Sequence, residues 1–185
     1  MSKKFLQVDV SNSKKEENLI QIRFRNEDVL QVNFSKFIDQ SKYIRDKYNY
    51  QEALYSIQYE IEKVQEDMNI NEESIKYFIQ IIAEEKVNIP IEHYTDIYTL
   101  SEYFSIPTIT TELDNISQKE LFKDLNFSIQ ILHDSETVNS SYETKLISKI
   151  ENFLIEKINE CIKNAKFGEL EVSTIFRIVE QSKEK

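Results

Sequence analysis

Few residues in this chain have the types and spacing that catalysis or metal binding requires. The run His133, Asp134, Ser135 and Glu136 carries hydrolase side chains, but the members of a catalytic triad meet in space rather than as sequence neighbours. No HExxH motif includes either histidine, His93 or His133, which excludes the usual helical zinc-protease site. We therefore expect no catalytic residues in this run.

The scarcity of glycine and cysteine excludes further classes of site. Gly168 is the only glycine, so a glycine-rich phosphate loop or nucleophile elbow cannot form. Cys161 is the only cysteine, which excludes an internal disulfide and a zinc site of several cysteines. Cys161 falls on an apolar helical stripe, where we expect a buried and inert thiol. Most glycine-dependent and zinc-dependent classes of enzyme are thus excluded, and we expect no metal and no cofactor.

The net charge and the hydropathy of the chain argue against nucleic acid and membranes as binding partners. The 185 residues carry a formal net charge of -10, which disfavours nucleic acid and anionic membrane surfaces. No targeting segment and no membrane-spanning stretch is recognisable, so we expect a cytoplasmic protein, with the nucleus as the alternative.

Several short segments alternate apolar and polar residues with the period of two that is typical of β-strands. Residues 19–24 and 29–34 are separated by a short polar turn, which predicts a β-hairpin. Residues 5–10 (FLQVDV) predict an N-terminal strand, followed by a polar linker over 11–18. Residues 55–61 (YSIQYEI) predict the third strand of the sheet.

Apolar residues at helical spacing predict helices between and after these strands. Ser35 is the expected N-cap of one helix that reaches Tyr48. Asn71, followed by Glu72 and Glu73, predicts a helix start, because acidic groups in the first turn oppose the positive end of the helix dipole. The further helices expected in this half cover residues 71–85, 93–104 and 107–113.

The second half predicts helices alone. Ser117 and Glu120 form a capping-box pattern that is expected to start a helical region. A long helix is expected through residues 147–161, with Gly168 as its left-handed terminator or in the loop just beyond, and a last helix from about Ser173. The fold class is therefore α+β, with an N-terminal strand and linker, a mixed domain and an all-α helical extension over residues 1–18, 19–116 and 117–185.

The order of elements and one stretch of sequence resemble the BTB/POZ fold, which includes the Skp-type adaptors and elongin C. Over residues 78–110 the family has a Y-T-G-x-V-x-I turn and a helix ending L-x-x-A-x-Y-F-x-I-P. Val87 and Ile89 match the V-x-I, and the later signature is matched by Leu100, Tyr103, Phe104, Ile106 and Pro107. Residues 41–45 (SKYIR) resemble the family's S-x-x-F-R. The resemblance implies a three-stranded sheet capped by helices.

The resemblance covers about residues 19–113 and has departures. Ala83 and Glu85 stand where the family usually has the Tyr and Gly of Y-T-G, so this turn must be built differently, and Asn33 replaces a frequent histidine. The helices from 117 onward are similar to a BACK-type extension. Residues 166–182 resemble such a region in proteins whose BTB-like module precedes ankyrin repeats, although no ankyrin pattern is present here.

The resemblance implies partner-binding surfaces, because BTB-like domains bind other proteins. Members that bind cullins often carry a hydrophobic-x-acidic pattern that Ile70-Asn71-Glu72 fits. Ile70 would then be an exposed apolar anchor, and Glu72 a charge that fixes orientation. The alternative is an ordinary capped helix start.

Self-association is a second expectation, through the strand that carries Phe5, Val8 and Val10. Dimeric members place a swapped strand and a long helix ahead of the hairpin, but residues 11–18 are too polar and short for that helix. The alternative is that this strand pairs with the chain's own sheet edge.

The resemblance implies a non-enzymatic protein–protein interaction module: a BTB-type adaptor that links a cullin-like scaffold to a client protein for ubiquitin ligation. The alternative is a structural or oligomerisation module that anchors a larger assembly without any cullin. Both expectations involve protein partners, with no nucleic acid and no membrane insertion.

Overall fold

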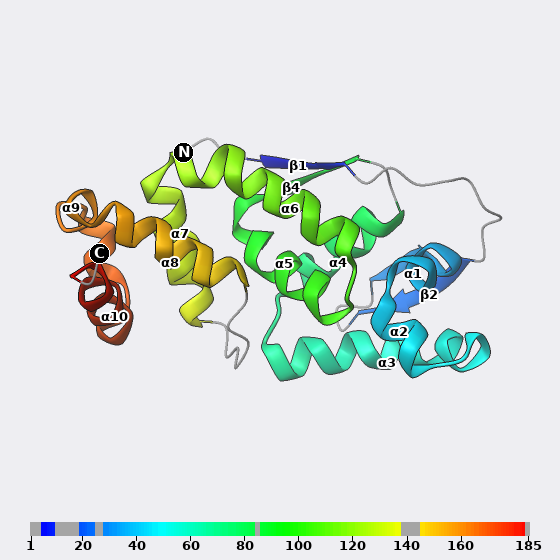
Figure 1. Ribbon diagram of the computed structural model, residues 1–185. Helices are drawn as coiled ribbons and strands as arrows, with labels where there is room; N and C mark the ends of the chain where they lie inside the picture. Colours follow the sequence, from blue (N-terminus) through cyan, green and yellow to red (C-terminus); the bar gives the residue numbers. More distant parts are fainter. Residues whose placement is uncertain (1–4, 10–18, 25–27, 84–85, 138–144, 184–185) are drawn as a thin grey trace. The chain divides into compact units, whose positions relative to one another are not determined.

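Two compact units, Met1–Leu113 and Asp114–Lys185, make up the chain in the computed structural model (Figure 1). Strands and helices mix in the first unit and the described elements of the second are helical, which confirms the α+β class. Both the expected domain boundary after residue 116 and the division after Leu113 fall inside one helix, α6 (Pro107–Glu120). The structure describes residues 5–9, 19–24, 28–83, 86–137 and 145–183.

The described strands form two separate two-stranded antiparallel sheets. The predicted hairpin is confirmed: β2 (Leu19–Arg23) pairs with β3 (Val29–Asn33), and buried Ile22 and Val32 attach it to the core. The N-terminal strand β1 (Phe5–Asp9) pairs with β4 (Lys86–Pro90) of the same chain. The expected three-stranded sheet is therefore wrong for the described residues.

The third predicted strand, over residues 55–61, is helical and belongs to α3 (Tyr50–Met68). A capping box starts this helix: the side chain of Asn49 accepts from the backbone N–H of Glu52, whose carboxylate accepts from the backbone N–H of Asn49. The residues that α3 buries recur at helical spacing, namely Ala53, Ile57, Ile61, Val64 and Met68. This long apolar stripe overrides the local alternation.

The single helix expected from Ser35 to Tyr48 is two helices, α1 (Phe34–Gln40) and α2 (Lys42–Lys47). Ser41 causes the break, since its hydroxyl donates to the carbonyl of Phe104 at 2.6 Å and accepts from the N–H of Ile44 at 3.2 Å. Asn33, and not Ser35, caps α1 by accepting from the N–H of Lys36.

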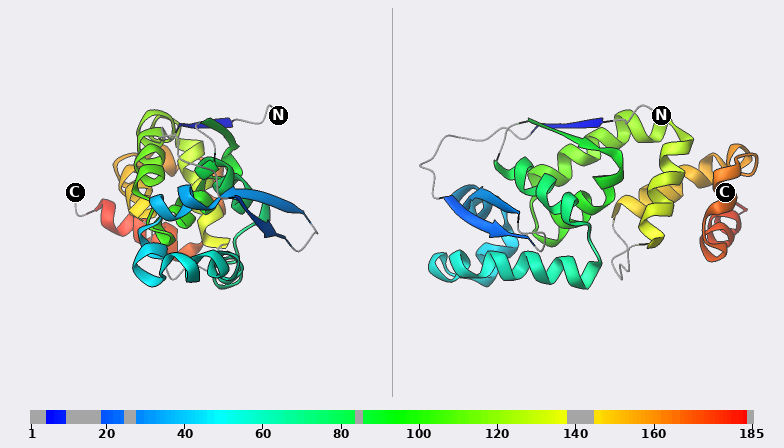
Figure 2. Two further views of the ribbon diagram at one scale, coloured as in Figure 1. Left: turned by 90° about the vertical axis from the view of Figure 1, so that its right-hand side faces the viewer. Right: turned by 180° about the vertical axis from the view of Figure 1, so that it is seen from behind.

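Helix α4 (Glu72–Ala83) is the centre of the first unit, and it confirms the helix predicted over 71–85. It contacts α1, α3, β3, β4 and α5 (Tyr94–Tyr103), and α5 follows a short 3-10 turn, η1 (Ile91–His93). The rings of Phe78 and Phe104 stack at 5.7 Å between centroids. The pair β1 and β4 lies on one side of this unit and α3 on the other, with α4 and α5 between them (Figures 1 and 2).

The second unit continues with η2 (Leu121–Lys123), α7 (Leu125–Thr137), α8 (Lys145–Glu156), α9 (Ile158–Cys161), η3 (Ala165–Glu169) and α10 (Val172–Ser182). Helix α10 confirms the predicted last helix. Ser117 starts no helix, because it is buried within α6. The long helix expected over 147–161 is interrupted at Lys157. Gly168 lies inside η3 without a positive φ, so it is not a left-handed terminator.

Across the described ranges, no helix combines the length and apolarity that a bilayer crossing requires.

Candidate functional site

The start of α4 does not present Ile70 as an exposed residue. Ile70 is only 3% exposed, so the prediction of an exposed apolar anchor is wrong. Asn69 ends α3 in the left-handed conformation, with φ of 50°, and the N–H of Ile70 donates back to the carbonyl of Gln65 at 3.2 Å. An apolar residue directly after such a terminator commonly folds back on its helix, which explains the burial of Ile70.

Glu72, the second residue of the predicted anchor, belongs to an ion-pair cluster around Lys76. The ammonium group of Lys76 lies 2.5 Å from Asp28, 2.7 Å from Glu73 and 3.3 Å from Glu72. Hydrogen bonds to these carboxylates, that of Asp28 foremost, raise the pKa of Lys76. The three carboxylates could in principle converge on a metal ion, but the lysine supplies their counter-charge.

A serine, a histidine and an aspartate meet at the same end of α4, a group that no motif of the sequence predicts. Ser74 Oγ donates to Asp96 at 2.6 Å and lies 2.8 Å from His93 Nδ1, while the N–H of Asn71 donates to Asp96. Because the hydroxyl proton goes to Asp96, His93 must donate to Ser74 and cannot act as its base. Ser74 is also fully buried. The group caps α4 and ties it to α5.

The strand expected to mediate self-association, β1, is engaged within the chain. Phe5 lies opposite Pro90 and Val8 opposite Val87 in the antiparallel pair with β4. Val10 lies outside the described residues. The alternative of pairing with the chain's own sheet edge is therefore the arrangement present.

A buried charged cluster fixes α3 against α2 and α5. The carboxylate of Glu60 accepts from Lys47 at 2.8 Å, from Tyr43 at 2.9 Å, from Tyr103 at 3.1 Å and from Tyr48. Burial alone would raise the pKa of Glu60, but these hydrogen bonds overcome it and hold the pKa at about 2. Glu60 is thus an ionised centre that orients α3.

The outer face of α3 exposes large aromatic side chains. Tyr55 is 80% exposed and Tyr59 is 60% exposed, and their spacing of four residues places them side by side. Glu62 and Glu66 continue the same face toward the end of the helix. We call these four residues the α3 outer face.

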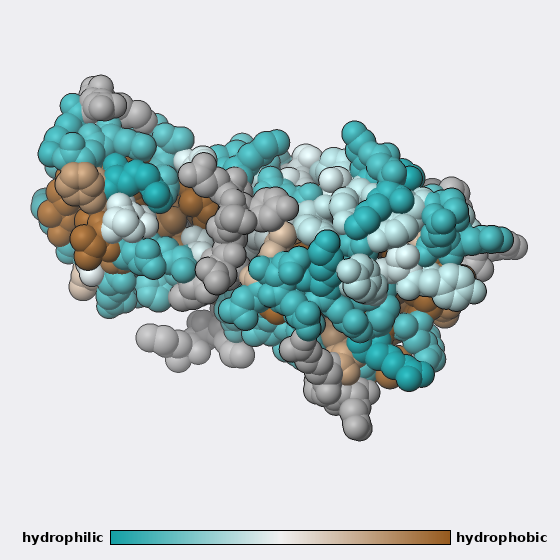
Figure 3. Space-filling view, turned by 90° about the horizontal axis from the view of Figure 1, so that it is seen from below, coloured by the Kyte–Doolittle hydropathy of each residue, from teal (hydrophilic) through white to brown (hydrophobic). Residues whose placement is uncertain are grey.

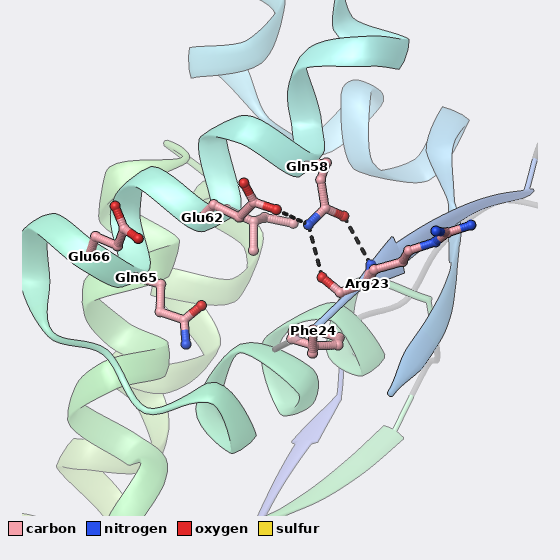
Figure 4. Close-up of a pocket in the computed structure, with 7 residues that line it drawn as sticks. Arg23, Phe24, Gln58, Glu62, Gln65 and Glu66 are labelled. Carbon is pink, nitrogen blue, oxygen red and sulfur yellow. Dashed lines mark hydrogen bonds between the residues drawn. The ribbon is translucent and has the colours of Figure 1, made fainter. Parts of the chain in front are cut away.

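A hollow of about 250 Å³ lies between this face and the end of β2. The amide of Gln58, one of its lining residues, reaches from α3 to β2: it accepts from the backbone N–H of Arg23 at 3.0 Å and donates to the backbone carbonyl of Arg23 at 2.9 Å (Figure 4). It also donates to Glu62 at 2.6 Å. The residues that line the hollow are Arg23, Phe24, Gln58, Ile61, Glu62, Gln65 and Glu66.

The second unit has an exposed apolar surface of its own. Val172 and Phe176, one turn apart on α10, are 82% and 66% exposed, and Ile162 beyond α9 is also exposed. Apolar side chains gather over the C-terminal helices of this unit (Figure 3). Thr174 and Ile178 on the other face of α10 are buried, so only Val172 and Phe176 carry this exposed apolar surface on α10.

Comparison of the chain with models of protein families, with curated protein sequences and with solved structures found no match. The resemblance to the BTB/POZ fold accordingly rests on the sequence motifs.

Proposed function

We propose that this chain is a protein–protein interaction module of the BTB/POZ type, an adaptor that links a cullin-like scaffold to a client protein. The observation that carries the proposal is the exposure of Tyr55 and Tyr59 on one face of α3. Exposed tyrosines on a rigid element are typical of residues that dominate binding energy at protein interfaces. The proposal assigns no catalytic step to the chain and a cytoplasmic or nuclear location.

The rigidity of α3 supports this proposal. Its start is fixed by the capping box of Asn49 and Glu52, and its middle is fixed by the four donors around Glu60. A preorganised helix loses little conformational freedom on binding, so more of the contact energy appears as affinity. The scaffold is therefore proposed to contact Tyr55 and Tyr59 on α3 rather than Ile70, which is buried. Glu72 and Glu73 remain at the start of α4 as accessory charges.

An assembly module without a cullin is the second candidate, and the surface of α10 favours it. Val172 and Phe176 form an exposed apolar stripe in a unit separate from α3. Such an exposed apolar surface is suited to bind a further helix of an assembly. The two candidates thus use different residues and different units.

Affinity purification of the tagged full chain, with partners identified by mass spectrometry, separates these candidates. We expect a cullin-like scaffold with the unchanged chain, and its loss with Tyr55→Ala/Tyr59→Ala, since truncating hot-spot tyrosines costs about 2 kcal/mol or more, roughly 30-fold in affinity. Phe176→Ala is the matched control, an exposed aromatic in the other unit, and it should retain the scaffold. A partner set that lacks a cullin and is lost with Phe176→Ala would contradict the adaptor and support the assembly module.

A further inference from the structure

Strand β2 has a partner on only one of its two edges within the described part of the chain. The N–H of Phe24 donates to the carbonyl of Asp28 at 2.9 Å, which fixes the hydrogen-bonding phase of the hairpin. Arg23 therefore directs its N–H and carbonyl away from β3, and every second residue before it does the same. Gln21 and Leu19 thus present their backbone groups along the outer edge of β2, and both residues are exposed.

Gln58 already imitates one residue of a neighbouring strand at this edge. Its amide oxygen and nitrogen bind the N–H and the carbonyl of Arg23, the two bonds that a paired strand residue would make. The edge is therefore held in the geometry that accepts a strand. The side-chain amide binds the backbone groups of Arg23 alone. The outward-facing backbone groups of Gln21 and Leu19 continue the edge beyond the reach of Gln58.

The hollow beside this edge is lined by apolar and acidic side chains. Phe24 and Ile61 are both buried and give it an apolar floor, while Glu62 and Glu66 on α3 give it an acidic rim. The guanidinium of Arg23 points away from these two carboxylates (Figure 4). An apolar floor with an acidic rim fits the aliphatic stem and cationic head of lysine or arginine. The net charge of -10 favours the approach of a basic segment.

We propose that the outer edge of β2 binds an extended, basic peptide segment of a partner protein. The segment adds a strand along Leu19 and Gln21 and inserts a lysine or arginine side chain into the hollow between Phe24 and α3. Main-chain bonds supply affinity in this mode of recognition, and the pocket supplies specificity. The inference rests on the proposed function only in taking the partner to be a protein. In it, the client binds the outer edge of β2, and the scaffold binds Tyr55 and Tyr59 on α3.

Three labelled ten-residue peptides test the proposal by fluorescence anisotropy with the full chain. The first alternates valine with lysine, the second has glutamate for lysine, and the third has proline at two central positions, which removes N–H donors. We expect the lysine peptide to bind, and the other two to bind at least about tenfold more weakly, as expected for the loss of a charge contact or of ladder bonds. Equal binding of the lysine and glutamate peptides, or no binding of either, overturns the proposal.

Variants of the chain locate the binding edge. Gln21→Pro removes an outward N–H of β2, a change that edge strands tolerate, and should weaken the lysine peptide about tenfold. Gln31→Pro is the matched control, since Gln31 lies opposite Gln21 in the hairpin and faces the other edge. Glu62→Gln/Glu66→Gln should reduce the preference for lysine over glutamate. If Gln31→Pro abolishes binding of the lysine peptide and Gln21→Pro does not, the proposal is contradicted. Circular dichroism verifies that each variant is folded.

Two further outcomes separate this inference from the proposed function and from self-association. Tyr55→Ala/Tyr59→Ala should bind the lysine peptide as the unchanged chain does, so loss of the scaffold and loss of the peptide are independent results. Sedimentation should give a species whose mass does not depend on Gln21→Pro. A dimer that Gln21→Pro abolishes would mean that a second copy of the chain occupies the edge, which overturns the proposal.

Discussion

The replacement Glu60→Gln tests whether an ionised carboxylate holds α3 in place. Glutamine keeps the size of the side chain but removes the charge, and it offers one acceptor oxygen to Lys47 and three tyrosine hydroxyls. Lys47 is part exposed and can turn to solvent, whereas the tyrosines are left to compete for one oxygen. The variant should therefore have a lower free energy of unfolding than the unchanged chain.

The pKa of Glu60 sets the size of the expected loss of stability in Glu60→Gln. Its value of about 2 in the folded chain, against an ordinary 4.5, corresponds to about 3 kcal/mol in favour of the ionised folded form. Because the folded pKa is the lower one, this stabilisation is present above pH 4.5 and declines as the pH falls toward 2. At pH 3 about 2 kcal/mol of it is already lost. Glu60→Gln should thus cost about 3 kcal/mol at pH 7 and about 1 kcal/mol at pH 3.

Urea denaturation followed by far-ultraviolet circular dichroism at the two pH values measures both costs. Asp67→Asn is the matched control, an exposed acidic residue on the same helix whose replacement should change the free energy of unfolding by less than about 0.5 kcal/mol. A cost for Glu60→Gln that is equally small at pH 7, or that is the same at pH 3 and pH 7, would refute the reasoning from an ionised buried centre.

Two other buried side chains give predictions that share no residue with this cluster. Ile70→Arg should destabilise the first unit by about 4 kcal/mol, because an unpaired charge enters the core. The conservative change Ile70→Val should cost about 1 kcal/mol. If Ile70→Arg were as stable as the parent in urea, Ile70 would lie at the surface. Burial raises the pKa of Cys161 to about 11, so its thiol should resist Ellman's reagent at pH 8 until urea unfolds the chain. Rapid reaction of the folded chain would contradict the buried position of that thiol.

Elements whose signals are local could be predicted from the sequence. The hairpin β2–β3 follows from alternation on both sides of a short polar turn, and Ile22 and Val32 are buried as that alternation requires. Helix α4 follows from two glutamates in the first turn and a stripe at helical spacing, all of it buried. In these segments local propensity and tertiary packing favour the same structure.

Features that depend on distant residues could not be predicted. Ser41 caps α2 by a local bond to Ile44, and its second bond, to the carbonyl of Phe104, comes from a residue 63 positions away. Ile70 is buried because Asn69 turns the chain, a conformation that its sequence position alone does not require. The group of Ser74, His93 and Asp96 joins α4 to α5 through contacts that cross about twenty positions.

The wrong prediction at residues 55–61 has a direct bearing on the candidate site. In a strand, the alternation there would put Tyr55, Ile57, Tyr59 and Ile61 on one face; in α3, Ile57 and Ile61 enter the core while both tyrosines remain exposed. The segment predicted to complete the sheet thus adds no third strand to the outer edge of β2, which has none among the described residues, and supplies the amide of Gln58 to it. The same helical conformation therefore creates the exposed tyrosines and the open edge, which is why both binding surfaces that we propose border α3.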